Sequence, residues 1–270
     1  GERDKKTDKV EAEELELAPL VQDNELEQDS RNSDCYAQER LSETISLWKV
    51  VKLSQSELVQ GLDETTDLVP GRYEGGFKVW ECSVDLCQYL VDSFSLKELR
   101  DRHVLELGCG QGLPGILCLL GGAKQVVFQD FNKEVLQGVT HPCVAKNIHS
   151  SAPPFQGGGH GLARFLSGDW GGCSTFLDKH QFDLILTAET IYEPKSVPDL
   201  LELLTWCLNP DRGVALVASK VYYFGVGGGV GPFEEAVKMQ GIFDLKHVFS
   251  VDDGASNMRE ILMLTWKKKS

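Results

Sequence analysis

The order of apolar and polar positions along this chain predicts strands and helices that follow one another from about residue 83 to the end. Short, almost wholly apolar runs predict five strands, over 103–107, 125–130, 163–170, 182–192 and 213–220. Apolar residues at helical spacing predict helices over about 83–93, 114–120, 132–147, 197–208 and 232–239. Continuous apolar runs are typical of parallel strands covered on both faces, so the pattern indicates an α/β fold.

Three glycines, Gly108, Gly110 and Gly112, follow the first predicted strand directly. A strand, a glycine-rich turn and a helix form the unit that cradles nucleotides in open α/β sheets. Glycine is needed there because a ligand must approach the bare backbone. Gly110, Gly112 and Gly115 fit the dinucleotide spacing G-x-G-x-x-G. With Glu106, the first three glycines fit E-x-G-x-G-x-G, which resembles motif I of S-adenosylmethionine-dependent methyltransferases, and the acidic residue favours this second frame.

The end of the chain distinguishes between these two frames. Two late apolar runs, 243–251 and 259–266, are joined by the short polar segment 252–257. So short a connection allows only an antiparallel hairpin. Five strand–helix units followed by a hairpin are similar to a seven-stranded methyltransferase sheet, whereas a dinucleotide dehydrogenase would carry a sixth parallel strand. We therefore expect an α/β, Rossmann-like, seven-stranded class I methyltransferase sheet with a C-terminal antiparallel hairpin.

Further candidates for cofactor binding lie near the ends of the predicted elements. Asp130 comes about 20 residues after the glycines, where a carboxylate can bond both hydroxyls of a ribose. Its alternative role is to cap the next helix, but Asn132 can do that capping. Asp169 can accept a hydrogen bond from the amino group of an adenine, and the indole of Trp170 can stack on the adenine ring. Trp80, which could equally be a core aromatic, precedes the first helix and can wall one side of a pocket.

Composition and charge narrow the class of protein. A hydrophobic content of 41% is enough for a sizeable core, and no apolar run approaches the roughly 18 residues that span a bilayer. The formal net charge of −14 argues against binding nucleic acid through its phosphates, and it suits a basic partner.

Much of this charge lies in residues 1–45, which hold 14 Asp and Glu against 6 Lys and Arg, with Tyr36 as their only aromatic. Such a segment cannot bury enough apolar area to offset its ordering entropy, so we expect an acidic, disordered tail. Removal of residues 1–44 should then leave folding and cofactor binding unchanged. Residues 46–270 are expected to form one S-adenosylmethionine-dependent methyltransferase domain, with a Pro/Gly-rich loop over 149–162.

The cysteines favour a reducing compartment. The 8 cysteines are scattered, and no apolar N-terminal segment indicates a signal peptide, so we expect an intracellular protein. Cys82 and Cys87 are too far apart for a C-x-x-C site, and no second pair answers them. We therefore expect no metal.

Several motifs together resemble the protein-histidine methyltransferases, which belong to a larger group of methyltransferase-like enzymes that modify lysines of folded proteins. These motifs lie at 79–81, 106–112, 129–130, 168–170, 189–192 and 219–229. The resemblance spans roughly residues 70–266. Motif I and Asp130 are shared by all such methyltransferases, whereas Tyr73-Glu-Gly-Gly and the glycine-rich loop after Tyr222 resemble the histidine branch alone.

The resemblance implies S-adenosylmethionine as cofactor and methylation of one histidine, at its tele nitrogen, in a basic ribosomal protein of the large subunit. The residues expected to bind the cofactor are Trp80, Glu106, Gly108, Gly110, Gly112, Asp130, Asp169 and Trp170. We further expect a monomer in the cytoplasm and nucleus, including the nucleolus, without direct nucleic-acid or membrane binding.

The chemistry of that reaction suggests candidate catalytic residues. Methyl transfer from a sulfonium is an in-line displacement, in which placement of the reactants does most of the work. The imidazole must be neutral, and a group that accepts from its other ring N–H would fix the reactive tautomer. Four residues are candidates that the sequence does not rank: Glu189, Tyr192, Tyr222 and Tyr223. The loop from Tyr222 to Gly229 is expected to hang over the methyl group.

Other functions remain open on the sequence. A methyltransferase of the same family could act on lysine or another protein group. An NAD-dependent oxidoreductase is disfavoured by the terminal hairpin and by Glu106, and a scaffold without catalysis is the non-enzyme alternative. Mass spectrometry of a labelled substrate would separate histidine from lysine methylation.

Overall fold

A computed structural model describes residues 10–17, 20, 35–52, 69, 72–94, 96–150, 161–252, 254 and 257–268. Its centre is one eight-stranded sheet, in the order β1-β6-β5-β4-β7-β8-β10-β9. These strands are β1 (Glu13–Glu14), β4 (His103–Leu107), β5 (Gln125–Asp130), β6 (Leu162–Ser167), β7 (Leu184–Ala188), β8 (Val214–Lys220), β9 (Phe243–Val251) and β10 (Arg259–Trp266).

Strands β4 to β8 are parallel, and β10 pairs antiparallel with both β8 and β9. This arrangement confirms the seven-stranded sheet with its C-terminal hairpin, to which β1 adds one short antiparallel edge strand. Strand β4 is the switch point, because β5 and β6 extend the sheet to one side of it and β7 and β8 to the other. Ligands of such sheets bind at the carboxyl ends of the strands beside that point.

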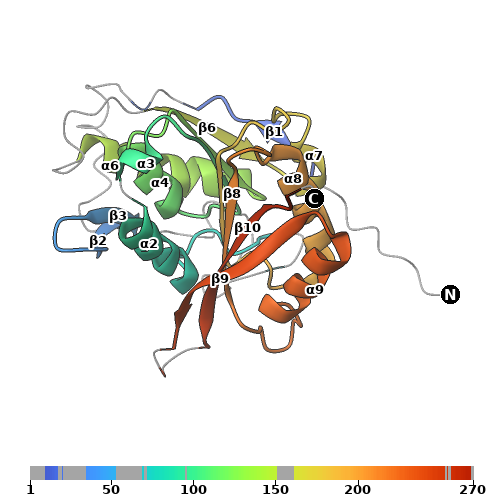
Figure 1. The fold of residues 1–270 in the computed structure, drawn as a ribbon. Coiled ribbons are helices and arrows are strands. Elements are labelled where there is room, and N and C mark those ends of the chain that lie inside the picture. The colour runs from blue at the N-terminus through green and yellow to red at the C-terminus, as the bar shows by residue number, and fades with distance from the viewer. Residues whose placement is uncertain are drawn as a thin grey trace.

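Helices cover both faces of the sheet (Figure 1). They are α2 (Glu81–Ser93), α3 (Leu96–Leu99), α4 (Leu113–Leu120), α5 (Lys133–Val135), the π-helical turn Leu136–Thr140, α6 (His141–His149), α7 (Trp170–Cys173), the 3-10 turn Pro194–Ser196, α8 (Val197–Cys207) and α9 (Val230–Gln240). Successive side chains of β4 belong to two different hydrophobic cores. Val104 packs with α2, α4 and α6, and Leu105 packs with α8 and α9. The inner strands β4, β5, β7 and β8 are thus buried on both faces, as their apolar sequences require.

The expectation of a disordered tail is wrong for the parts of residues 1–45 that the structure describes. Strand β1 pairs with the edge of β6, where Glu14 accepts two bonds from the Arg164 guanidinium, 2.6 and 2.9 Å long. Strands β2 (Tyr36–Arg40) and β3 (Ser46–Val50) form a hairpin. Leu41 is buried in the core beside it. Average composition concealed these few apolar and edge-pairing residues, and the rest of the segment lies outside the described residues.

The hairpin is also tied to the glycine turn. The side-chain amide of Gln111 accepts from the backbone N–H of Val50 at 2.8 Å and donates to its carbonyl at 2.9 Å. Of the expected loop over 149–162, residues 151–160 lie outside the described part. Within the described residues, no helix is long and apolar enough to cross a bilayer. The same residues contain no group of His, Cys, Asp and Glu arranged to hold a metal.

Candidate active site

A cavity of about 330 Å³ lies at the carboxyl ends of the parallel strands. The turns after β4, β5, β6 and β7 line it on one side, and the segment 74–80 that leads into α2 lines it on the other. Seven of the eight residues predicted to bind the cofactor line this cavity, together with Glu189 and Tyr192 of the predicted catalytic set; Gly112 does not line it.

The glycine turn needs its glycines for conformation and for space. Gly108, Gly110 and Gly112 all have positive φ, at 60°, 50° and 74°, which side chains rarely adopt. A Cβ on Gly110 would lie 3.1 Å from the carbonyl oxygen of Gly76. The segment before α2 therefore packs directly on the bare backbone of the turn.

Glu106 supports this turn by a hydrogen bond to the start of the helix that follows it. Its Oε2 accepts from the backbone N–H of Gly115 at 2.8 Å, so the carboxyl satisfies one of the free donors of the first turn of α4. Burial raises the pKa of Glu106 to about 8, against the effect of that hydrogen bond, and the Asp130 charge raises it further. Glu106 is thus a neutral anchor of the helix at neutral pH as well as part of the cavity wall.

The Asp130 carboxylate accepts two backbone hydrogen bonds at the end of β5. Its Oδ2 accepts from the N–H of Gly110 at 2.9 Å and its Oδ1 from the N–H of Asn132 at 3.1 Å. Burial raises its pKa to about 6, and these backbone bonds oppose the rise. Each carboxylate oxygen has a second lone pair, so the side chain can still accept from a ribose.

The Asn132 side chain does not cap the helix, contrary to expectation. Instead it accepts from the backbone N–H of Glu74 at 3.0 Å and donates to the carbonyl of Arg72 at 2.8 Å. It therefore ties the segment before α2 to the end of β5. The sequence could not show this, because the partners are some 60 residues apart.

A network around Gln129 holds the turn after β6. The Gln129 amide donates to the carbonyl of Gly168 at 2.8 Å, and its oxygen accepts from the Trp170 indole at 2.9 Å. The same oxygen accepts from the N–H of Gly108 at 3.3 Å. Asp169 caps α7 by accepting from the N–H of Gly171 at 3.0 Å. Gln129 thus joins the two turns expected to hold the ends of the cofactor.

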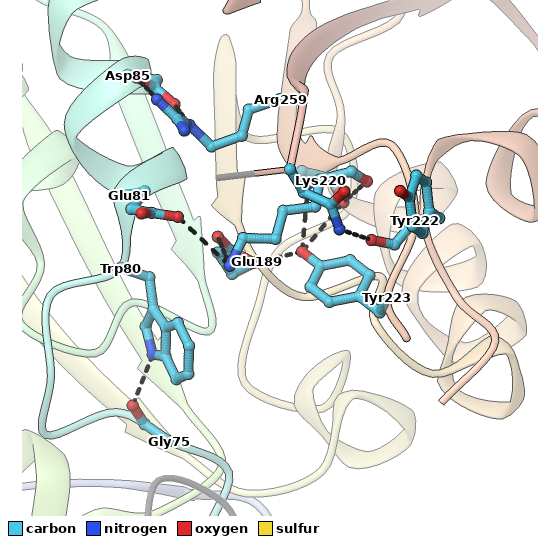
Figure 2. Close-up of polar contacts among 11 residues, drawn as sticks. Gly75, Trp80, Glu81, Asp85, Glu189, Lys220, Tyr222, Tyr223 and Arg259 are labelled. Atoms are coloured by element: carbon cyan, nitrogen blue, oxygen red, sulfur yellow. Dashed lines mark hydrogen bonds and ion pairs between the residues drawn. The ribbon is translucent and has the colours of Figure 1, made fainter. Parts of the chain in front are cut away.

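Trp80 lies in the opposite wall, where its indole N–H donates to the carbonyl of Gly75 at 2.9 Å (Figure 2). The Nζ atoms of Lys78 and Lys220 lie 5.3 and 5.7 Å from the centre of its ring. Trp80 is therefore a wall of the cavity held in a fixed orientation, and the negative face of its ring is turned to cations.

Glu189 begins the polar segment after β7 with a left-handed backbone, at φ 58°. Its N–H donates to the carbonyl of Ala218 at 2.9 Å, which holds this conformation in place. Its Oε2 accepts from the Tyr223 hydroxyl (Figure 2), while Oε1 is buried and has no hydrogen-bond partner within the described chain. Unusual backbone at the edge of a cavity is typical of functional sites.

Two of the predicted tyrosines also serve this site. Burial, together with the neighbouring Glu189 charge, raises the pKa of Tyr223 well above its ordinary value, so its hydroxyl stays a donor. The Tyr192 hydroxyl donates to the Glu74 carboxylate, and burial likewise raises the pKa of Tyr192. This second bond joins the segment after β7 to the segment before α2 across the cavity.

Tyr222 is placed differently from expectation. The residue is 46% exposed, its ring packs edge-on against Phe224, and its carbonyl accepts from the Asn257 amide at 2.8 Å. It does not line the cavity. The glycines that follow approach the chain's own backbone: Gly228 donates to the carbonyl of Tyr192 at 3.0 Å, and a Cβ there would lie 2.2 Å from the Tyr192 carbonyl carbon.

Comparison with known proteins identifies the family. A family model described as lysine methyltransferase matches residues 70–223. Histidine protein methyltransferase 1 homologues of Dictyostelium discoideum and Rattus norvegicus are 44% and 38% identical, over 76% and 77% of this chain and 62% and 61% of theirs. The chain thus spans about three fifths of the length of these relatives.

A solved structure shows the same fold. The arsenic(III) S-adenosylmethionine methyltransferase of Chlamydomonas reinhardtii superposes with a TM-score of 0.50 at 15% identity, over 67% of this chain and 73% of that one. With so low an identity the likeness concerns the fold alone.

The residues around the cavity fit S-adenosylmethionine, the cofactor of this family. The bare glycine turn gives backbone access, and Asp130 has lone pairs for ribose hydroxyls. The carboxylates of Glu74 and Glu189 and the face of Trp80 can stabilise a cationic sulfonium. From the match to the family model and the identity with its relatives, the chain belongs to the class I methyltransferase family that includes the histidine protein methyltransferases.

Proposed function

We propose that this protein methylates a histidine side chain of a protein substrate at the tele nitrogen. The proposal rests on Glu189, whose Oε1 is buried at the cavity and lacks a hydrogen-bond partner among the described residues. A carboxylate oxygen there can accept from the pros N–H of an imidazole. The tele nitrogen would then keep its lone pair free to attack a methyl group.

The surrounding residues suit this role. When bound, S-adenosylmethionine would supply an electrophilic methyl group, and the electron pair of the broken carbon–sulfur bond would leave with S-adenosylhomocysteine. Tyr223 occupies the other oxygen of Glu189, which leaves Oε1 for the substrate. As the bond from nitrogen to the methyl carbon forms, positive charge develops on the ring, and the Glu189 carboxylate stabilises it until the pros proton passes to solvent. Trp80 and Tyr192, in the walls of the cavity, limit the access of water.

For the substrate, we propose a basic protein of the large ribosomal subunit. The resemblance to the histidine branch supports this, and the net charge of −14 would attract such a partner, with an on-rate that falls as salt rises. We propose that the protein acts as a monomer and works in the cytoplasm and nucleus, where such a substrate is made and assembled. Size-exclusion chromatography and microscopy of a fluorescent fusion test these two points.

Lysine methylation is the second candidate. The matching family model is described as lysine methyltransferase, and the EEF1A lysine methyltransferase 3 of Mus musculus is 32% identical over 53% of this chain and 55% of its own. In that reaction Glu189 would face an amine, which must lose its proton before it attacks. The two candidates therefore differ in the substrate atom that carries the new methyl group.

One experiment distinguishes them. The protein is incubated with methyl-labelled cofactor and a purified large-subunit ribosomal protein fraction, and the label is located by fragment mass. Chromatography of the acid hydrolysate then separates tele- from pros-methylhistidine. Label on lysine would sink the histidine proposal, and label on the pros nitrogen would sink the proposed role of Glu189. Glu189→Gln is expected to lower transfer by about a hundredfold while cofactor affinity stays within a few-fold.

A further inference from the structure

We propose that Lys220 is a positioning residue for methyl transfer, whose ammonium group holds the Glu189 carboxylate in the orientation that faces the substrate ring. This inference rests on the proposed function of Glu189. Lys220 lies outside the residues that the sequence singled out as the site. Its signals there were its place at the carboxyl end of a parallel strand and within the motif 219–229.

The position of the ammonium group is the first argument. Lys220 is the last residue of β8, and its Nζ lies 3.7 Å from Glu189 Oε1 and 3.4 Å from Glu81 Oε2. Figure 2 shows its side chain running between these carboxylates, with the Trp80 ring alongside. Lys220 therefore reaches the same oxygen of Glu189 that is left open for the substrate.

Burial is the second argument. The Glu189 side chain is 5% exposed and that of Lys220 is 20% exposed. An ion pair that is largely removed from water is screened little by solvent, so the attraction between its two groups is stronger than at an exposed site. The ammonium group therefore restricts the Glu189 carboxylate to one orientation.

The other groups around Glu189 do not replace this cation. Tyr223 donates to Oε2 as a neutral hydroxyl. The Cys82 thiol on α2 also faces Glu189, and burial raises the pKa of that thiol far above its ordinary value, so it is neutral. Arg259 on β10 is engaged by Asp85 through a bond of 2.5 Å. Of the described cations, Lys220 is the one that pairs with Glu189.

A purely structural role would be different. Lys220 also links β8 to the first turn of α2 through Glu81, and a tie of this kind affects folding but not the orientation of Glu189. Loss of such a tie would lower the melting temperature. Loss of the positioning role would lower kcat in a folded protein at unchanged cofactor affinity, because a Glu189 side chain that is free to turn holds the substrate ring less often in the reactive orientation.

The experiment compares Lys220→Met and Lys220→Arg with the unaltered protein, using the full chain, and Lys246→Met on the exposed face of β9 is the matched control. The melting temperature and the kcat and KM of transfer to histidine are measured for each protein. For Lys220→Met we expect a folded protein with kcat about tenfold lower and cofactor affinity within a few-fold. Lys220→Arg is expected to restore kcat, and Lys246→Met to leave it unchanged.

An unchanged kcat in a folded Lys220→Met protein overturns the proposal, as does a loss that Lys220→Arg does not rescue. A protein that carries both Lys220→Met and Glu189→Gln gives a second reading, because a lysine that acts through Glu189 has no further effect on kcat once Glu189 is replaced. A full further loss of kcat in that double variant would overturn the proposal equally. Label on lysine in the unaltered protein, by contrast, refutes the proposed function, so the two failures are distinguishable.

Discussion

Replacement of Glu106 by Gln is expected to stabilise the protein, although Glu106 belongs to motif I. The buried carboxyl bonds the backbone N–H of Gly115 at 2.8 Å and has its pKa raised to about 8 from 4.5. The folded state therefore holds a proton that the unfolded chain releases. Stability from this group is fully present below a pH of about 4.5 and is lost progressively as the pH rises toward about 8.

The magnitude follows from the same shift. At about pH 7 folding must return a proton to a group whose unfolded pKa is 4.5, which costs about 1.4 kcal/mol per unit, or about 3 kcal/mol in all. Gln keeps a carbonyl oxygen for Gly115 and carries no charge to desolvate. We expect Glu106→Gln to be more stable than the unaltered protein by about 2–3 kcal/mol at neutral pH and nearly equal to it at about pH 5.

Urea unfolding at a series of pH values from about 5 to 8 measures this difference. Glu235→Gln, at an exposed site on α9, is the control that should show no such trend. A difference between Glu106→Gln and the unaltered protein that did not grow with pH would refute the reasoning. Cofactor affinity should stay within a few-fold, because the Glu106 contact is made to the helix.

Three further changes test other parts of the site. Asp130→Asn turns an amide donor toward one of the two backbone N–H groups from which the carboxylate accepts. Titration calorimetry should show cofactor affinity lowered about 10-fold or more, and urea unfolding a loss of stability of about 1.5–3 kcal/mol. Unchanged values would contradict the assignment of Asp130 to the cofactor site. Tyr223→Phe leaves Glu189 Oε2 without its donor and should lower the methyl-transfer rate at least about tenfold at unchanged cofactor affinity, and a normal rate would exclude this role. Deletion of residues 1–44 removes β1, β2 and buried Leu41 and should cost at least about 2–5 kcal/mol of stability; an unshifted melting temperature would show that these elements are dispensable.

The fold could be predicted from the sequence because the signals that specify it are local. A strand buried on both faces must be apolar throughout, as β7 is, and a reversal at positive φ requires glycine, as at Gly108 and Gly110. The seven residues between β9 and β10 are too few for a crossover, so an antiparallel hairpin was the only possible connection. Parallel topology then brings the strand ends together, which placed most of the candidate residues around one cavity.

The contacts within the site were decided by tertiary structure alone. Tyr222 and Tyr223 are neighbours in sequence, but the turn after β8 directs one to solvent and the other to Glu189. Lys220 reaches Glu189 only because β7 and β8 are adjacent in the sheet. Strand β1 is ordered because β6 offers it an unpaired edge. Each of these contacts joins residues whose proximity arises from the folded backbone, and periodicity and composition carry no information about it.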